Sequence, residues 1–252
     1  MFGKIIYYDK KTVDEYTALI NGKRNVQVEE YDVANDKGMK ADLKILEADA
    51  KASKSYKAKV QESTLFDCNQ FEMLLSGRDD FIDFTASEGR TVDTASRGYI
   101  IKINAFVSIP EEFDMVALID RFKPLLINAI DIEETDSNSK MALQTFLGNA
   151  KATKIPIILE ADDDILCGKI VADNLIIDYA ELEEFDGEEI TVLARCASNG
   201  MNDSNKAIYD PLKDFLTLNR ALRKQMKEKP DELGSIYVET NYKPIDILAI
   251  YR

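Results

Sequence analysis

The sequence predicts an α+β fold of mixed strands and helices, with a β-rich carboxy-terminal half packed by one amphipathic helix. From position 150 onward, apolar or alternating runs recur about every ten residues between polar turns, as is typical of an antiparallel meander or small barrel. Asp210 and Pro211 then suit the N-cap and the first turn of a helix over 211–229. The runs that predict strands are Ile155–Leu159, Cys167–Val171, Leu175–Leu182 and Ile190–Cys196.

The amino-terminal half combines strands with short helices. Lys4–Asp9 is an apolar run that predicts a strand, and Thr12 with Glu15 has the spacing of a helix capping box. Asn21-Gly22 is a strong stop signal for the helix that follows Thr12. The other elements expected here are a helix over Leu65–Leu75, strands at Phe81–Phe84 and Tyr99–Ile109, and a helix over 111–122 that begins after Pro110.

The best boundary between two parts of the chain lies near Gly148, where the pattern changes from mixed elements to closely spaced strands. This predicts an α+β amino-terminal part over 1–148 and a β-rich carboxy-terminal part over 149–252, which contains the helix at 211–229. A single domain is the alternative, since 252 residues suit one large domain or two small ones.

The composition excludes most enzyme classes. The chain contains no His, so it cannot build a Ser-His-Asp or Cys-His nucleophile system, an imidazole general base or a His-ligated zinc site. It also lacks the glycine-rich motifs that cradle phosphates. We therefore predict no catalytic residue, and the sequence favours a protein that is not an enzyme.

Cysteine usage and hydropathy predict a cytoplasmic protein without membrane contact. The three cysteines (Cys68, Cys167 and Cys196) are far apart in the sequence, which argues against a disulfide scaffold and a structural zinc site. The sequence has no run of 18 apolar residues and turns charged soon after its start, so neither a membrane-spanning helix nor a secretory signal peptide is expected.

Negative charge is concentrated in one segment. The formal net charge is −14, and residues 160–189 carry twelve acidic residues and one basic residue, a net −11. Residues 213–229 carry six basic and two acidic residues, so the two segments could instead neutralise each other inside one domain. Direct nucleic-acid binding is not expected from this overall balance. The residues predicted to contact a basic protein partner are Asp162, Asp163, Asp164, Glu181, Glu183 and Glu184.

Asp162, Asp163 and Asp164 form the densest carboxylate cluster. Carboxylate oxygens are ligands for Mg²⁺ and Ca²⁺, so Asp162 and Asp164 are the candidate metal ligands. The glycine and acid that an EF-hand requires are at the wrong offsets here, and the sequence favours a solvated turn between two strands over a metal site. No organic cofactor is predicted, and a divalent metal is the one inorganic cofactor that the sequence leaves open.

Both ends of the chain resemble an uncharacterised family of bacterial proteins. The resemblance covers IIYYDKKTVDEYTALINGK at positions 5–23 and PIDILAIYR at 244–252, and the middle segment GYIIKINAFVSI at 98–109 is compatible with it. No activity is assigned to this family. The resemblance implies a cytoplasmic bacterial protein, with some relatives encoded among mobile-element or antiviral gene sets.

Three functions are therefore open. We expect a non-catalytic binding or regulatory protein that engages a basic protein partner through its acidic segment. The first alternative is a phosphoester hydrolase that uses clustered carboxylates and a divalent metal. The second alternative is an acidic inhibitor that imitates nucleic acid. These three hypotheses differ in where they require the carboxylates to lie.

Overall fold

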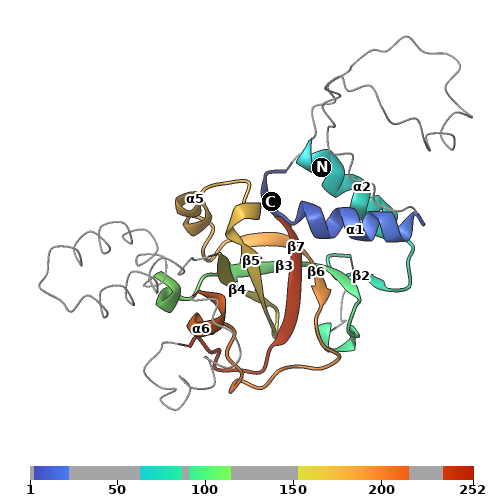
Figure 1. The fold of residues 1–252 in the computed structure, drawn as a ribbon. Helices are drawn as coiled ribbons and strands as arrows, with labels where there is room; N and C mark the ends of the chain where they lie inside the picture. Colours follow the sequence, from blue (N-terminus) through green and yellow to red (C-terminus); the bar gives the residue numbers. More distant parts are fainter. Residues whose placement is uncertain (1–2, 23–62, 87–90, 115–152, 216–234) are drawn as a thin grey trace, which may run out of the picture.

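The computed structural model describes residues 3–22, 63–86, 91–114, 153–215 and 235–252. These residues combine helices with a strand-rich sheet, so the predicted α+β class is confirmed. The elements are β1 (Ile5–Tyr8), α1 (Lys10–Ile20), α2 (Thr64–Leu75), β2 (Phe81–Asp83), β3 (Ile100–Ser108), β4 (Lys154–Ala161), β5 (Asp164–Val171), α5 (Tyr179–Glu183), β6 (Glu189–Cys196), α6 (Pro211–Asp214) and β7 (Lys243–Tyr251) (Figure 1).

Five of the strands form a ring. β3, β4 and β5 are consecutive antiparallel neighbours, and β6 returns to lie antiparallel to β3 on its other edge. This arrangement is a Greek key, in which the fourth strand lies beside the first. β7 completes the ring because it pairs antiparallel with β6 and parallel with β5. The result is a five-stranded, partly open Greek-key barrel, an architecture best known from the OB-fold.

Two short strands extend the barrel at its edges. β1 runs antiparallel to β7, and β2 runs parallel to the start of β3. The sheet thus pairs β1 and β3, from the predicted amino-terminal part, with strands of the predicted carboxy-terminal part. The alternative of a single domain agrees with this pairing. Gly148, the predicted boundary residue, lies outside the described residues.

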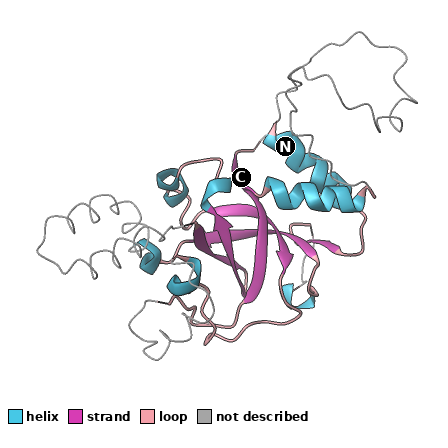
Figure 2. Ribbon diagram, viewed as in Figure 1, coloured by secondary structure: helices cyan, strands magenta, loops and turns pink. Residues whose placement is uncertain are grey.

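Apolar residues fill two separate cores. The larger core is the barrel interior, where alternate residues of β3, such as Ile101 and Ile103, meet the inward side chains of the other strands. The smaller core lies between the outer face of the sheet and the two long helices, where Phe71 of α2 packs with Leu193 and Leu248. Figure 2 shows both helices alongside the sheet. A register shift in the β6–β7 pairing adds Leu248 to this outer face.

The start of the first helix differs from the prediction. Asp9, not Thr12, is the N-cap of α1, and its carboxylate accepts hydrogen bonds from the Thr12 amide and hydroxyl. Asp is at least as good an N-cap as Thr, so the helix begins three residues earlier than the capping-box spacing suggested. The predicted end at Asn21-Gly22 is confirmed, and Gly22 has a φ of 64°, which favours glycine.

One predicted strand is wrong. Leu175–Leu182 does not form a strand, because α5 begins at Tyr179 after the Asp178 side chain accepts a hydrogen bond from the Glu181 amide. This N-cap decides the local structure of an apolar run too short to show periodicity clearly. Of the helix predicted over 111–122, the structure describes residues 111–114, which are helical. Of the helix predicted over 211–229, the helical part that it describes is α6. Residues 115–122 and 216–229 lie outside the described residues.

The described part of the chain contains no helix that is long and apolar enough to cross a membrane. All three cysteines are buried as free thiols, and burial raises the pKa of Cys68 and Cys167 to about 12. A thiol with so high a pKa is almost fully protonated at neutral pH and is therefore a poor nucleophile.

Candidate functional site

The predicted partner-binding acids do not share one surface. Asp162 and Asp163 form the turn between β4 and β5, which confirms the interpretation of this cluster as a turn. Asp162 has a φ of 51°, and the carboxylate of Asp164 accepts a hydrogen bond of 2.8 Å from the Val92 amide. The Asp164 side chain is therefore already used to fix the turn against the segment that precedes β3.

The glutamates lie beyond the other end of the same hairpin. Glu181 and Glu183 belong to α5, Glu184 is its C-cap, and the Glu181 carboxylate forms an ion pair with Lys4. The eight residues of β5, about 26 Å long at the rise of a β-strand, separate this group from the Asp162 turn along the chain. That all six acids bind a basic partner stays a prediction. Such a partner would have to contact both the Asp162 turn and α5.

The Asp162 turn offers few ligands for a metal. Among the described residues, no group of three or more Cys, Asp or Glu side chains is arranged to hold an ion. Asp162 and Asp164 are thus two carboxylates of which one is engaged with a backbone amide. The metal site at these residues stays a prediction.

A groove of about 610 Å³ opens along the seam between β5 and β7. Among the described residues, five cationic side chains line it with two carboxylates, Asp9 and Asp246, and a third carboxylate, the buried Asp214, pairs with Lys169 at one end. The groove therefore has a net positive charge, opposite to that of the chain. Parallel pairing between β5 and β7 covers only two residue pairs, after which β7 pairs with β1 instead. The cations that line the groove are Lys154, Lys169, Arg195, Lys206 and Lys213.

The end of the groove beside α6 is built around a buried carboxylate. The Asp214 side chain is 0% exposed, and its Oδ2 accepts hydrogen bonds from Lys169 Nζ and from the Asp210 amide. Asp214 Oδ1 lies 3.8 Å from Lys154 Nζ, an ion-pair distance that is too long for a hydrogen bond. Lys213, next to Asp214, lines the same end. The ammonium groups of Lys169 and Lys154 thus lie at ion-pair distance from one carboxylate, and together with Lys213 they leave this end positive.

Lys169 is the most enclosed of these cations. It lies on β5 between the buried Gly168 and Ile170, and its ammonium group is 5.7 Å from the centre of the Tyr209 ring. Burial lowers the pKa of Lys169, Asp214 opposes this shift, and nearby Lys213 and Lys154 add to it. The result is an ammonium group held in place by a carboxylate and an aromatic ring.

The end of the groove beside α1 has different chemistry. Arg195 of β6 donates from Nε and Nη2 to Asp246 Oδ2 of β7, at 3.1 and 2.5 Å. Tyr16 and Thr12 of α1 add hydroxyl groups to the lining. Hydrogen bonding to Asp246 raises the pKa of Arg195, which is thus firmly charged. Among the described residues that line this end, Arg195 is the cation, and Asp246 neutralises it. This end therefore offers hydrogen-bonding groups and has no excess positive charge.

The rest of the lining is largely apolar. It includes Val171 and two tyrosines, together with Ile208 and Leu248, which are buried in the cores behind the groove. The Tyr242 hydroxyl donates a hydrogen bond of 3.1 Å to the Lys206 carbonyl, which fixes the loop that follows β6. This loop, β5 and β7 therefore form the wall of the groove.

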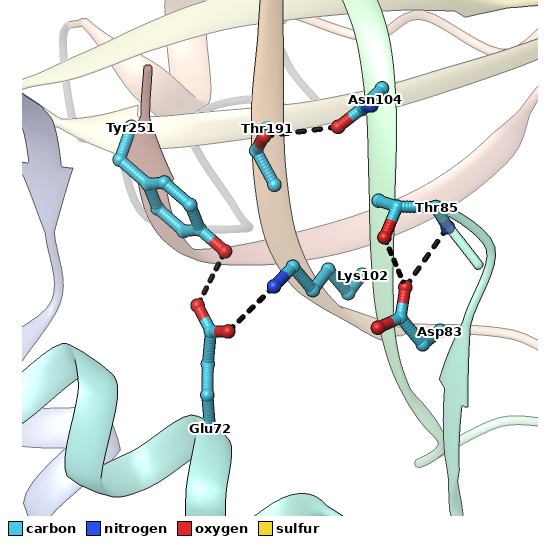
Figure 3. Close-up of polar contacts among 7 residues, drawn as sticks. All are labelled: Glu72, Asp83, Thr85, Lys102, Asn104, Thr191 and Tyr251. Carbon is cyan, nitrogen blue, oxygen red and sulfur yellow. Dashed lines mark hydrogen bonds and ion pairs between the residues drawn. The ribbon is translucent and has the colours of Figure 1, made fainter. Parts of the chain in front are cut away.

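A second polar cluster holds α2 against the barrel. Figure 3 shows Glu72 of α2 between Lys102 of β3 and Tyr251 of β7. The Glu72 carboxylate accepts hydrogen bonds from Lys102 Nζ at 2.6 Å and from the Tyr251 hydroxyl. Burial and the neighbouring Glu72 carboxylate raise the pKa of Tyr251, so its phenol stays protonated. Asn104 and Thr191 add a cross-strand hydrogen bond of 3.0 Å. We interpret this cluster as structural.

Sequence reasoning did not find the groove. Its five cations come from β4, β5, β6, α6 and the loop after β6, so no window of ten residues contains more than two of them. Lys169 was visible only as the single base in an acidic segment.

Comparisons with known proteins returned no match, whether with models of protein families, with curated proteins or with solved structures.

Proposed function

We propose that this protein is a binding protein whose groove holds a phosphate-bearing ligand. The observation that carries the proposal is the charge of the groove, where five cations outnumber the carboxylates of Asp9, Asp246 and the buried Asp214 in a chain of net charge −14. Lysine ammonium groups are common phosphate ligands, and several of them around one cavity favour a ligand with more than one negative charge. The groove volume falls in the usual range for small-molecule sites.

The architecture supports this proposal by analogy. Barrels of the OB type bind oligonucleotides and oligosaccharides at the face of their second and third strands and at the loops beside them. In this barrel the corresponding strands are β4 and β5, which carry Lys154 and Lys169, and the loop after β6 carries Lys206. The lysines thus lie where this architecture offers a ligand surface.

The overall charge of the chain does not oppose such a ligand. At about 0.15 M salt, charges more than about 8 Å apart are largely screened from each other. The acids of the Asp162 turn and of α5 lie beyond the two ends of the hairpin that carries the groove lysines. The expectation of no nucleic-acid contact came from the overall charge and does not apply to this local surface. Three free cysteines suit a cytoplasmic location, which we include in the proposal.

Isothermal titration with inorganic pyrophosphate tests the proposal. The test variant is Lys206→Ala with Lys213→Ala, because both side chains are exposed and line the groove. Loss of two phosphate contacts is expected to weaken binding by about tenfold or more. The matched control, Lys10→Ala with Lys11→Ala, removes the same charge from exposed positions of α1 that do not line the groove. Equal affinity of the two double variants would contradict the proposal.

A further inference from the structure

One row of side chains on the outer face of the barrel alternates apolar and acidic residues. Phe106 of β3 lies directly opposite Glu160 of β4 on one side and Glu189 of β6 on the other. Residues directly opposite each other on antiparallel strands point to the same face, with their Cβ atoms about 5 Å apart. Ile165 of β5, opposite Glu160, extends the row. Strand pairing thus places an aromatic ring between two carboxylates that are far apart in the sequence.

The end of the outer face that carries this row is open to solvent. Phe106 is 53% exposed, and Glu160 and Glu189 are exposed on either side of it. Lys102, four residues earlier on β3, has a side chain only 18% exposed, and its ammonium group donates to Glu72 of α2 (Figure 3). Helix α2 therefore shields the outer face at Lys102 and leaves Phe106 uncovered.

The two carboxylates of the row are not neutralised by the barrel itself. Within the described residues, neither Glu160 nor Glu189 has an ion-pair partner, and Arg252 pairs with Glu188 instead. A group that complements this face must therefore be cationic and must also cover an aromatic ring. A guanidinium group does both, because it is planar, stacks on aromatic faces and donates paired hydrogen bonds to carboxylates.

We infer that the Phe106 face, which consists of Phe106, Glu160, Glu189 and Ile165, binds an arginine-bearing segment of a basic partner protein. The guanidinium group stacks on the Phe106 ring and donates to the flanking glutamates. A lysine side chain fits less well, since its ammonium group is a compact, strongly hydrated charge without a flat face. The inference does not depend on the proposed groove ligand, because none of these four residues lines the groove.

The test compares a six-residue arginine peptide with a six-residue lysine peptide by isothermal titration against the whole chain. The two peptides have the same formal charge, so stacking on Phe106 predicts about threefold tighter binding of the arginine peptide. Phe106→Ala and Phe106→Leu both remove the ring and should bind the two peptides equally. The matched control is Tyr237→Ala, which removes a ring of nearly equal exposure (54%) and should keep the preference for arginine.

A second pair of variants tests the carboxylates. Glu160→Gln with Glu189→Gln should weaken binding of the arginine peptide by about fivefold. Glu183→Gln with Glu184→Gln removes the same charge from exposed positions at α5 and should change the affinity by less than about twofold, because salt screens distant charges. All the substituted side chains are exposed, so each variant should unfold at the urea concentration of the original chain.

Three outcomes would overturn the inference. Equal affinity of the original chain for the two peptides, or no binding of either, would exclude a site that selects the guanidinium group. Equal losses in the two glutamine double variants would mean that the peptides respond to the overall charge of the chain and not to the Phe106 face. A dimer that dissociates on Phe106→Ala in analytical ultracentrifugation would make a second copy of the chain the occupant of this face.

Discussion

The groove and the acidic segment at 160–189 differ in how their charged residues are distributed in the sequence and in space. The acidic residues are contiguous in the sequence, yet the fold places them at a turn and on a helix beyond opposite ends of one hairpin. The groove lysines are scattered in the sequence, yet the fold brings them to one cavity. In this protein the acidic run therefore does not form one surface, whereas strand pairing brings distant lysines to one groove.

The largest expected effect is on stability, from loss of the ion pair between Asp214 and Lys169. Asp214→Ala leaves Lys169 partly buried without its carboxylate partner, so we expect the free energy of unfolding to fall by about 3–5 kcal/mol. Glu181→Ala breaks the exposed pair with Lys4 and should cost less than about 1 kcal/mol. Urea unfolding measures both. A similar loss of unfolding free energy in the two variants would show that burial does not make the Asp214–Lys169 pair more important for stability than the exposed pair.

A smaller effect is expected at the seam that forms the groove. A Cβ atom at Gly168 would come within 2.9 Å of Ile247 Cγ1 and 3.0 Å of the Ile245 carbonyl, so Gly168→Ala forces β5 and β7 apart. We expect a loss of about 1–3 kcal/mol in a urea melt. The matched control is Gly200→Ala, where a Cβ meets nothing within 4 Å and stability should barely change. Equal stability of the two variants would mean that β5 and β7 can move apart at Gly168 without a loss of unfolding free energy.

The pH dependence of binding tests the enclosed lysine. The pKa of Lys169 is lowered, so its positive charge is lost on raising the pH before that of an exposed lysine, and affinity for pyrophosphate should fall in the alkaline range. In the same window the unfolded state binds the proton more tightly, so the contribution of Lys169 to the free energy of unfolding rises with pH.

Lys169→Arg provides the matched comparison for this titration. Arginine stays charged throughout the range, so the variant should hold its affinity to higher pH than the original chain. Measuring both proteins in the same buffers cancels any ionisation of pyrophosphate itself. Parallel pH profiles would exclude Lys169 as the group that titrates.

The smallest effect is expected at the Asp162 turn. Asp162→Asn with Asp163→Asn removes two charges but keeps the turn, because Asn tolerates the positive φ of 51° at position 162. Along β5 the turn is roughly 20 Å from Lys169, so pyrophosphate affinity should change by less than about twofold. Titration calorimetry at two salt concentrations measures this. A larger change would mean that the acidic segment and the groove act together.

Much of the fold could be predicted from local patterns. Strands such as β1 and β6 appeared as apolar runs close to their observed bounds, and the stop at Asn21-Gly22 ended α1 as expected. Short segments with competing signals were harder, since Asp9 took the cap expected of Thr12 and Asp178 turned an expected strand into α5. In both cases a side chain that accepts a hydrogen bond from a nearby backbone amide decided the local structure. The spacing of residues in the sequence does not show which of two possible capping side chains will make that bond.

The sequence by itself determined the α+β class, the absence of histidine chemistry and the approximate positions of strands such as β1 and β6, because these depend on residues close together in the chain. Only the tertiary structure decided that Lys154 and Lys169 both pair with one buried carboxylate, that Lys213 lines the same groove and that Arg195 meets Asp246. The physical reason is that strand order and register, which long-range packing of the barrel core fixes, choose which side chains share a face.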